Sequence, residues 1–306
     1  MTVPTPGPAA VTPPAPFGRI LTAMVTPFRP DGSLDVDGAA RLAEHLVDSG
    51  NDGLVVNGTT GESATTSDAE KEQVVRAVVE AVGDRASVVA GVGTNDTAHS
   101  VELAREAEKA GAHGLLVVTP YYNRPTQAGL LAHFTTVADA TGLPVMLYDI
   151  PVRSGVAVET DTLVCLAEHP RIVANKDAKG NLPETAWVLA RSDLAVYSGD
   201  DVLNLPLLAI GACGAVSVVA HLAADRLSEL ASAYLSGDVH RAREINQGLL
   251  PVYTGVMTRM QGVMAVKAAL SRLGLPSGPV RLPLVGATPA EVERLVEECA
   301  AGGVAL

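Results

Sequence analysis

Short apolar runs alternate with longer amphipathic stretches along most of the chain, from Ile20 to about residue 238. Each run has the length of a typical strand, and its lack of polar alternation is typical of strands buried on both faces of a parallel sheet. The pattern therefore predicts eight buried strands. They cover residues 20–25, 53–56, 87–91, 114–118, 144–148, 172–176, 194–198 and 214–218.

The stretches between these runs have the apolar spacing of helices that pack on a sheet. Segment 67–82 begins with Ser67 as N-cap and Glu70 three residues later, a capping box, and segments 97–110 and 127–140 are similar. Eight strand–helix units in about 215 residues predict an α/β fold, the closed (β/α)8 TIM barrel. A doubly wound open sheet is the alternative, which is disfavoured because no glycine-rich fingerprint follows the first strand.

The two ends of the chain differ from this central pattern. After Asp238 the strand rhythm stops, and segments 240–253, 261–273 and 289–300 predict three helices. We expect residues 239–306 to form a C-terminal helical subdomain, suited to oligomer contacts, after a catalytic barrel over residues 18–238. Residues 1–17 are rich in proline, threonine and alanine without periodicity, which predicts a disordered tail.

Composition excludes several classes of function. A net charge of −12 and a pI of about 5.0 argue against nucleic-acid binding, which needs a basic surface. No apolar run approaches the roughly 18 residues of a membrane span, and no secretory signal begins the chain. Cys165, Cys213 and Cys299 lack disulfide or metal-ligand spacing, so we expect reduced thiols, a cytoplasmic protein and no metal site.

One lysine stands out among the five in the chain, because Lys176 ends a short apolar run. Burial of an ammonium group favours the neutral amine, which makes Lys176 a candidate Schiff-base nucleophile. Lys71 and Lys109 lie in polar helical stretches, where we expect them to be solvated, and Lys179 follows the strand in a loop. Lys267 is the rival in an apolar setting, but we expect the C-terminal helices to place it away from the barrel mouth.

Polar residues follow several of the predicted strands, and in a (β/α)8 barrel the carboxyl ends of the strands carry the catalytic groups. A neutral Lys176 amine can attack a keto carbon and, with loss of water, form an iminium. This cation is an electron sink, so the neighbouring carbon loses a proton and an enamine forms. Tyr148 can relay protons, and Arg153 offers a two-pronged donor for a carboxylate. The strand-end segments are residues 57–63, 119–123, 148–155 and 198–201.

These segments together resemble the pyruvate-dependent class I aldolases related to N-acetylneuraminate lyase, over about residues 18–300. The resemblance is carried by Gly58-Thr59-Thr60-Gly61-Glu62-Ser63, Thr119-Pro120-Tyr121-Tyr122-Asn123-Arg124-Pro125, Tyr148-Asp149-Ile150-Pro151 with Arg153, Lys176-Asp177-Ala178 and Ser198-Gly199-Asp200-Asp201. It implies a barrel followed by C-terminal helices, and usually a homotetramer built as a dimer of dimers.

The resemblance also implies a role for each matching residue. Lys176 matches the Schiff-base lysine, and the proton-relay triad would be Tyr148, Thr59 and Tyr122, with Tyr122 contributed across a dimer interface. Thr60 matches a residue that holds the pyruvate carboxylate. Arg153 matches the arginine that binds the carboxylate of aspartate semialdehyde, whereas Gly199 and Val216 match positions lining the pocket near Lys176.

The arginine at position 153 distinguishes branches of this superfamily. It favours the branch that condenses pyruvate with L-aspartate 4-semialdehyde, the entry step to diaminopimelate and lysine, with no cofactor beyond the covalent imine on Lys176. Two other functions are kept as alternatives. One is another pyruvate aldolase, such as an N-acetylneuraminate or keto-deoxy sugar acid lyase, and the other is an oxoacid-binding barrel without turnover.

The chain departs from the family pattern at two places. Val152 stands where a small residue usually precedes the arginine, and its β-branched side chain stiffens that loop. Asp68, Lys71 and His99 occupy positions where lysine-sensitive members tend to carry His, His and Glu. Because a carboxylate is lost and a cation is added, we expect weak or absent inhibition by L-lysine.

Overall fold

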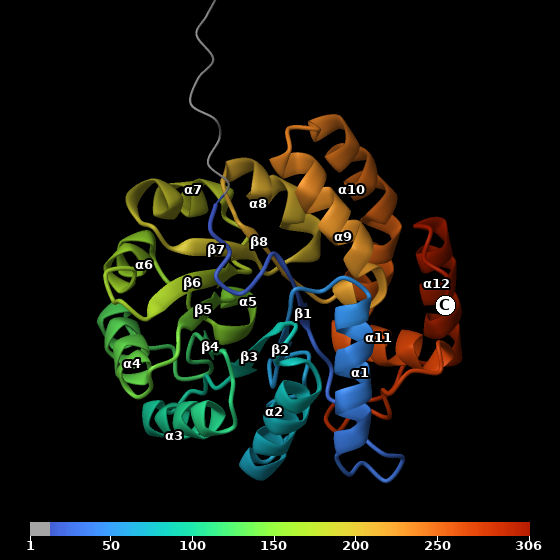
Figure 1. The fold of residues 1–306 in the computed structure, drawn as a ribbon, viewed down its shortest axis with the longest axis horizontal. Helices are drawn as coiled ribbons and strands as arrows, with labels where there is room; N and C mark the ends of the chain where they lie inside the picture. Colours follow the sequence, from blue (N-terminus) through green and yellow to red (C-terminus); the bar gives the residue numbers. More distant parts are fainter. Residues whose placement is uncertain (1–12) are drawn as a thin grey trace, which may run out of the picture.

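Eight parallel strands close into a barrel in the computed structural model, which describes residues 13–306 (Figure 1). Every strand pairs with the next, and β1 also pairs with β8, which completes the ring. The predicted TIM-barrel fold is confirmed, with each strand inside or within one residue of its predicted run. The strands are β1 (Ile20–Ala23), β2 (Gly53–Val56), β3 (Ser87–Gly91), β4 (Gly114–Val118), β5 (Val145–Asp149), β6 (Ile172–Asp177), β7 (Ala195–Ser198) and β8 (Gly214–Ser217).

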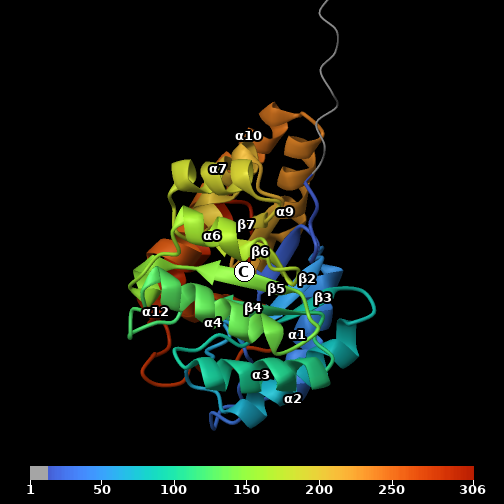
Figure 2. The same cartoon turned by 90° about the vertical axis from the view of Figure 1, so that its left-hand side faces the viewer.

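Helices surround the barrel, and their ends follow the local sequence signals (Figure 2). The capping box predicted for the second helix is present: the Ser67 backbone N–H donates to Glu70 Oε2 at 2.8 Å, and the Glu70 N–H donates to Ser67 Oγ at 3.3 Å. The helices are α1 (Val36–Asp48), α2 (Asp68–Val82), α3 (Thr97–Lys109), α4 (Gln127–Asp139), α5 (Pro151–Ser154), α6 (Thr160–Leu166), α7 (Leu182–Arg191), α8 (Asn204–Ile210) and α9 (Ala220–Leu235).

Two apolar layers hold these elements together, one between the strands and the helices and one inside the barrel. Because side chains alternate along a strand, every second residue points inward. Lys176 follows Ala174 by two residues on β6 and therefore shares its inward direction, at the carboxyl end of the barrel. The interior layer includes Leu21, Val55, Val89, Leu116, Met146, Tyr148, Ala174, Tyr197 and Val216.

The amino-terminal end of the barrel is closed by a residue that we assigned to the disordered tail. Phe17 is buried inside the barrel, and its backbone N–H donates to the Tyr197 hydroxyl at 3.1 Å, while that hydroxyl donates to the Gly18 carbonyl at 2.9 Å. Tyr197 therefore points away from the mouth, although it lies near a strand's carboxyl end. The structure thus differs from the predicted tail at Phe17, and residues 1–12 of that tail lie outside the described part of the chain.

The three predicted C-terminal helices are present as α10 (Val239–Tyr253), α11 (Gly262–Arg272) and α12 (Pro289–Ala301). A π-helical turn, Thr254–Thr258, joins the first two. α10 packs against α9, and the chain between α11 and α12 turns back toward the barrel (Figure 1). No helix within residues 13–306 is both long and apolar enough to cross a membrane.

Candidate active site

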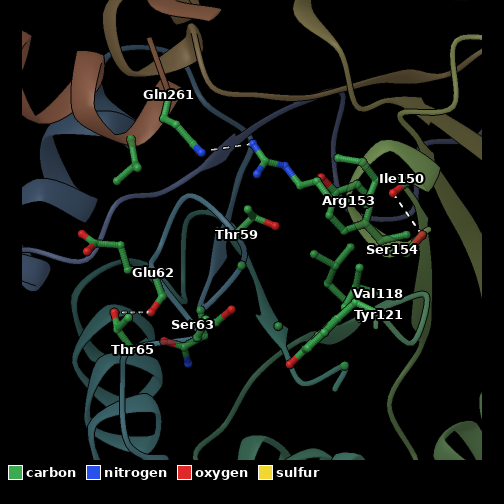
Figure 3. A pocket seen from close by; sticks show the side chains of 18 of the residues that line it. Thr59, Glu62, Ser63, Thr65, Val118, Tyr121, Ile150, Arg153, Ser154 and Gln261 are labelled. Carbon is green, nitrogen blue, oxygen red and sulfur yellow. Dashed lines mark hydrogen bonds between the residues drawn. The ribbon is translucent and has the colours of Figure 1, made fainter. Parts of the chain in front are cut away.

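A cavity of about 330 Å³ opens at the carboxyl ends of the strands (Figure 3). Its walls come from the loops after β2, β3, β4 and β5, and from the C-terminal part of the chain. Ligand sites of (β/α)8 barrels lie at this end of the barrel. The lining includes Thr59, Glu62, Tyr121, Tyr148, Arg153, Gln261, Val263, Pro283 and Leu284.

Lys176 lies beside the cavity-lining Tyr148 but outside the lining itself, and at 5% exposure it is almost fully enclosed. It is the direct cross-strand partner of Tyr148, and Lys176 Nζ lies 4.2 Å from the centre of the Tyr148 ring. Burial lowers the pKa of Lys176 to about 8; the Asp201 carboxylate opposes this shift and the Arg153 charge adds to it. A substantial fraction of the amine is therefore neutral near pH 8, the form that attacks a carbonyl carbon.

Asp201 belongs to one of the strand-end segments that carry the family resemblance, but no role was predicted for its carboxylate. It is buried just after β7, where it accepts hydrogen bonds from the backbone N–H groups of Val218 at 2.9 Å and Val219 at 3.1 Å and from the Ser217 hydroxyl. Burial raises the pKa of Asp201, and these hydrogen bonds lower it in part. The carboxylate thus joins the end of β7 to the start of α9 beside Lys176.

Tyr148 lines the cavity and is itself buried. Burial raises the pKa of Tyr148 to about 12, against the opposing effects of the Arg153 charge and a hydrogen bond with the Thr59 side chain. The phenol is therefore protonated at neutral pH and can donate a proton to an oxygen atom in the cavity. Thr59 also lines the cavity, whereas Thr60 follows it half-buried and outside the lining.

Two predicted pocket positions shape the surroundings of the lysine rather than the cavity wall. A β-carbon at Gly199 would lie 2.9 Å from Lys176 Cγ and 3.0 Å from Ala178 Cβ, so only glycine allows the lysine stem to pass at this distance. Val216 is buried on the inward face of β8. Gly199 therefore restricts the path of the Lys176 side chain, and Val216 belongs to the apolar layer inside the barrel.

Tyr122 is the one predicted catalytic residue that a single chain does not bring to the cavity. Its side chain is 90% exposed, its backbone is left-handed at φ 73°, and the cavity is lined instead by its neighbour Tyr121. A left-handed tyrosine carries backbone strain. Tyr122 is thus presented to solvent on a strained turn beside the mouth.

Arg153 lines the cavity opposite the loop after β2, as Figure 3 shows. Its Nη2 donates to Gln261 Oε1 at 3.5 Å, a long hydrogen bond that connects α5 to the C-terminal region. Val152 is 86% exposed, so its branched side chain points into solvent. The departure from the family pattern at position 152 therefore leaves the arginine in the cavity wall.

Two lysines are placed differently from the expectations drawn from sequence. Lys267 was expected away from the mouth, but it is buried with Nζ 2.6 Å from Oε1 of Glu62, which lines the cavity. Lys71 was expected to be solvated, yet its side chain is 12% exposed and Nζ donates to the Thr66 carbonyl at 2.6 Å. Lys179 lies in the loop after β6, as predicted, with its side chain buried and its Nζ 3.4 Å from Asp149 Oδ2.

These differences share a physical cause. Sequence periodicity predicts which segments are helical, but it does not predict which residues a long connection, such as the one between α11 and α12, brings against them. A signal did exist in the sequence. Glu62 stands among small residues and Lys267 among apolar ones, and charged side chains are almost never buried without a partner. Within the described chain, no group of three or more His, Cys, Asp or Glu side chains has a geometry that could hold a metal ion.

The chain is similar to known proteins over nearly its whole length. Residues 16–301 match the model of the dihydrodipicolinate synthetase family. The chain is 68% identical over 295 residues to 4-hydroxy-tetrahydrodipicolinate synthase 2 of Streptomyces coelicolor, covering 96% of this chain and 98% of that one. It is 67% identical over 290 residues to 4-hydroxy-tetrahydrodipicolinate synthase of Acidothermus cellulolyticus, covering 95% and 94%.

Solved structures agree with these sequence relatives. A dihydrodipicolinate synthase from Cyanidioschyzon merolae, solved with lysine bound, has a TM-score of 0.92 and 40% identity, covering 94% of this chain and 99% of that one. Dihydrodipicolinate synthase DapA-2 of Bacillus anthracis has a TM-score of 0.90 and 41% identity, covering 93% and 98%. The similarity therefore extends over the barrel and the C-terminal helices together.

Proposed function

The chain belongs to the dihydrodipicolinate synthetase family, and from this membership we propose that it condenses pyruvate with L-aspartate 4-semialdehyde to give 4-hydroxy-tetrahydrodipicolinate. The product leads to diaminopimelate and lysine, and the enzyme is a lyase of the class I aldolase type. The observation that carries the proposal is Lys176, a buried amine with a pKa of about 8 stacked against the cavity-lining Tyr148.

The proposed reaction begins with a bond between Lys176 Nζ and the keto carbon of pyruvate. Tyr148 gives a proton to the carbinolamine oxygen, which leaves as water, and the iminium then loses a methyl proton to become an enamine. The enamine carbon bonds to the aldehyde carbon of the semialdehyde. The semialdehyde's own amine next attacks the imine carbon, which closes the ring and frees Lys176. Every step uses groups of the chain and of the two substrates.

We assign the remaining predicted residues to the two carboxylates and to proton transfer. Thr60 holds the pyruvate carboxylate and Thr59 passes protons to and from Tyr148. Arg153 binds the carboxylate of the semialdehyde, because a guanidinium donates two parallel hydrogen bonds to a carboxylate. Gly199 sets the path of the Lys176 side chain, and Val216 packs inside the barrel.

We place Tyr122 in the site of a second subunit, within a homotetramer built as a dimer of dimers. Its 90% exposure and strained backbone at the mouth support this role, since a large aromatic side chain on a strained turn is stabilised by contact with a partner. A single subunit would then lack the third member of the proton relay.

Replacing Arg153 with alanine is expected to lower kcat/KM for the semialdehyde by about a hundredfold, mainly through KM, because the substrate carboxylate loses a charge-assisted partner. Borohydride trapping of pyruvate on Lys176 should be retained. Steady-state kinetics with both substrates varied measures the effect. Val152→Ala is the matched control and should leave both constants unchanged because Val152 points into solvent. An unchanged semialdehyde reaction in Arg153→Ala would refute the substrate assignment.

The pH dependence of imine formation follows from the lowered pKa of Lys176. Only the neutral amine attacks, so at subsaturating pyruvate the trapping rate should rise as pH increases toward about 8 and level off above it. An unperturbed lysine would instead give a rise toward a pKa near about 10.4. Rapid quenching with borohydride across pH 6 to 10, in steps of about half a unit, distinguishes the two profiles.

Inhibition by L-lysine is expected to be weak or absent. Asp68 Oδ2 already lies 2.9 Å from His99 Nε2, and Lys71 Nζ lies 3.6 Å from Asp68 Oδ1. A cationic effector would therefore meet a fixed cation and a carboxylate that is already paired. A loss of half the activity at submillimolar L-lysine would contradict this expectation. The variant Asp68→His, Lys71→His, His99→Glu is the matched control and should gain inhibition.

The two alternative functions make different predictions in the same assays. Another pyruvate aldolase would form the Lys176 adduct but prefer sialic acid or a keto-deoxy sugar acid in the cleavage direction. An oxoacid-binding barrel without turnover would give no borohydride-stable adduct. Trapping with pyruvate followed by a coupled assay with each electrophile therefore separates all three.

A further inference from the structure

The connection between α11 and α12 passes over the barrel mouth, and we name residues 277–284 of it the C-terminal strap. Pro283 and Leu284 of the strap line the cavity, together with Val263 of α11. These apolar side chains line the same hollow as Arg153 and Thr59, two polar residues labelled in Figure 3. The strap therefore forms part of the wall that a second substrate would meet.

Arg281 fixes the strap to two barrel loops. Its Nη2 and Nη1 form a two-pronged ion pair with Glu70 at 2.6 and 2.9 Å, and Nη1 also donates to the Thr65 carbonyl at 2.8 Å. The Nε and Nη2 groups donate to the Gly32 carbonyl at 3.0 and 2.8 Å. With its side-chain nitrogens all bonded in this way, the guanidinium has one defined position.

Lys267 and Phe28 add a second attachment below the strap. Lys267 Nζ donates to the Pro279 carbonyl at 2.8 Å, and the same ammonium lies 4.2 Å from the centre of the Phe28 ring. The Arg281 guanidinium lies 4.0 Å from that ring. The Phe28 N–H also donates to the Ser277 carbonyl at 3.2 Å. Two cations thus pack against one aromatic ring, an arrangement that requires nearby negative charge.

Glu62 supplies that charge and joins the strap to the loop after β2. Its Oε1 lies 2.6 Å from Lys267 Nζ, and its Oε2 accepts the Arg281 backbone N–H at 2.8 Å. Its own backbone N–H donates to the Thr59 carbonyl at 3.1 Å. The residue has a left-handed backbone at φ 55°, an uncommon conformation for glutamate. Strain of this kind persists only where surrounding contacts fix it, as the two bonds to the carboxylate do here.

We propose that Glu62 is a positioning residue of the condensation: its carboxylate clasps the strap to the Thr59 loop, so that Thr59, Pro283 and Leu284 together form the second-substrate half of the cavity. The inference rests on the proposed function for its substrate but on the contacts above for its geometry. Lys176 and Tyr148 lie on β6 and β5, and none of the Glu62 contacts described above involves either of them.

Glu62→Gln tests the clasp, because it keeps the side-chain shape and an acceptor for the Arg281 N–H but removes the charge facing Lys267. We expect kcat/KM for the semialdehyde to fall by about ten- to a hundredfold, with a raised KM, because small displacements of positioning groups are costly in rate. The yield of the borohydride adduct on Lys176 at saturating pyruvate should be retained. Hydrogen–deuterium exchange should increase in peptides covering residues 58–63 and 279–285.

Lost stability alone would also lower activity, so a double variant separates the two effects. Glu62→Gln leaves the Lys267 cation buried without a counter-charge, whereas Glu62→Gln with Lys267→Met removes both charges and should recover Tm. The proposal expects the high KM for the semialdehyde to persist in the double variant. A return of KM to the wild-type value together with Tm would overturn it and make Glu62 purely structural.

Glu298→Gln is the matched control within the same region. It removes a carboxylate that pairs with Arg259 at 3.0 Å between the π-helical turn and α12, outside the cavity lining, and should leave KM unchanged. Unchanged exchange at residues 279–285 in Glu62→Gln would contradict the clasp whatever reaction the enzyme catalyses. Absence of semialdehyde turnover in the wild type would instead contradict the proposed function.

Discussion

Lys176→Ala is expected to lose condensation activity by at least about a thousandfold, because the Lys267 amine, which also lies near the cavity, is held by Glu62 and the Pro279 carbonyl and cannot form the imine with pyruvate in its place. The side chain is held by Gly199 on one side and by the Tyr148 ring on the other. Lys179 is close in sequence but is buried against Asp149 on the outer face of the strands, so it cannot replace the missing amine. A coupled assay for the condensation measures the loss.

Borohydride trapping gives an independent measurement of the same substitution. The wild type should carry a single pyruvate adduct that peptide mass spectrometry places on Lys176, and Lys176→Ala should carry none. Lys109→Ala is the matched control, since Lys109 is exposed at the end of α3 and should affect neither assay. Full activity of Lys176→Ala, or an adduct on Lys267, would refute the mechanism.

Tyr148→Phe is expected to lower kcat by about a hundred- to ten-thousandfold, the range that a positioned proton donor contributes. The substitution keeps the ring that packs against the Lys176 ammonium and removes only the hydroxyl, whose pKa burial raises to about 12. Imine formation with pyruvate should slow without being abolished, because water can still deliver protons. Single-turnover trapping kinetics separate this step from the condensation.

Tyr197→Phe provides the matched control for Tyr148→Phe. It is the same substitution inside the same barrel, but the Tyr197 hydroxyl bonds to Phe17 and Gly18 at the opposite end. We expect a loss of stability of about 1 kcal/mol and unchanged kcat per folded enzyme. Equal losses of kcat in the two variants would contradict the role given to the Tyr148 hydroxyl.

The barrel could be predicted because its evidence is local and repeated. Each strand is a short apolar run and each flanking helix has its own caps, so the element order can be read without knowing any long-range contact. The pairing of Lys176 with Tyr148 also follows, since adjacent parallel strands bring their carboxyl ends together. The sequence therefore predicted both the fold and the base of the candidate site.

The parts that the sequence did not predict depend on pairing between distant segments. Phe17 closes the amino-terminal end of the barrel by bonding to a hydroxyl 180 residues away, although it ends a proline-rich stretch without periodicity. Lys267 meets Glu62 only because the strap turns back over the mouth. Neither contact leaves a periodic signal, since a single long-range contact imposes no repeat on the residues around it.

The clasp also bears on how the enzyme is made. The bond between the Arg281 N–H and Glu62 joins residues 219 positions apart, so the Thr59 loop leaves the ribosome long before its partner is synthesised. Domains begin to fold during synthesis, from the amino-terminal side. A nascent chain that stops before residue 281 can pair all eight strands and still lack one wall of its cavity. Premature termination shortly before residue 281 would thus yield a folded barrel that binds pyruvate but turns over poorly.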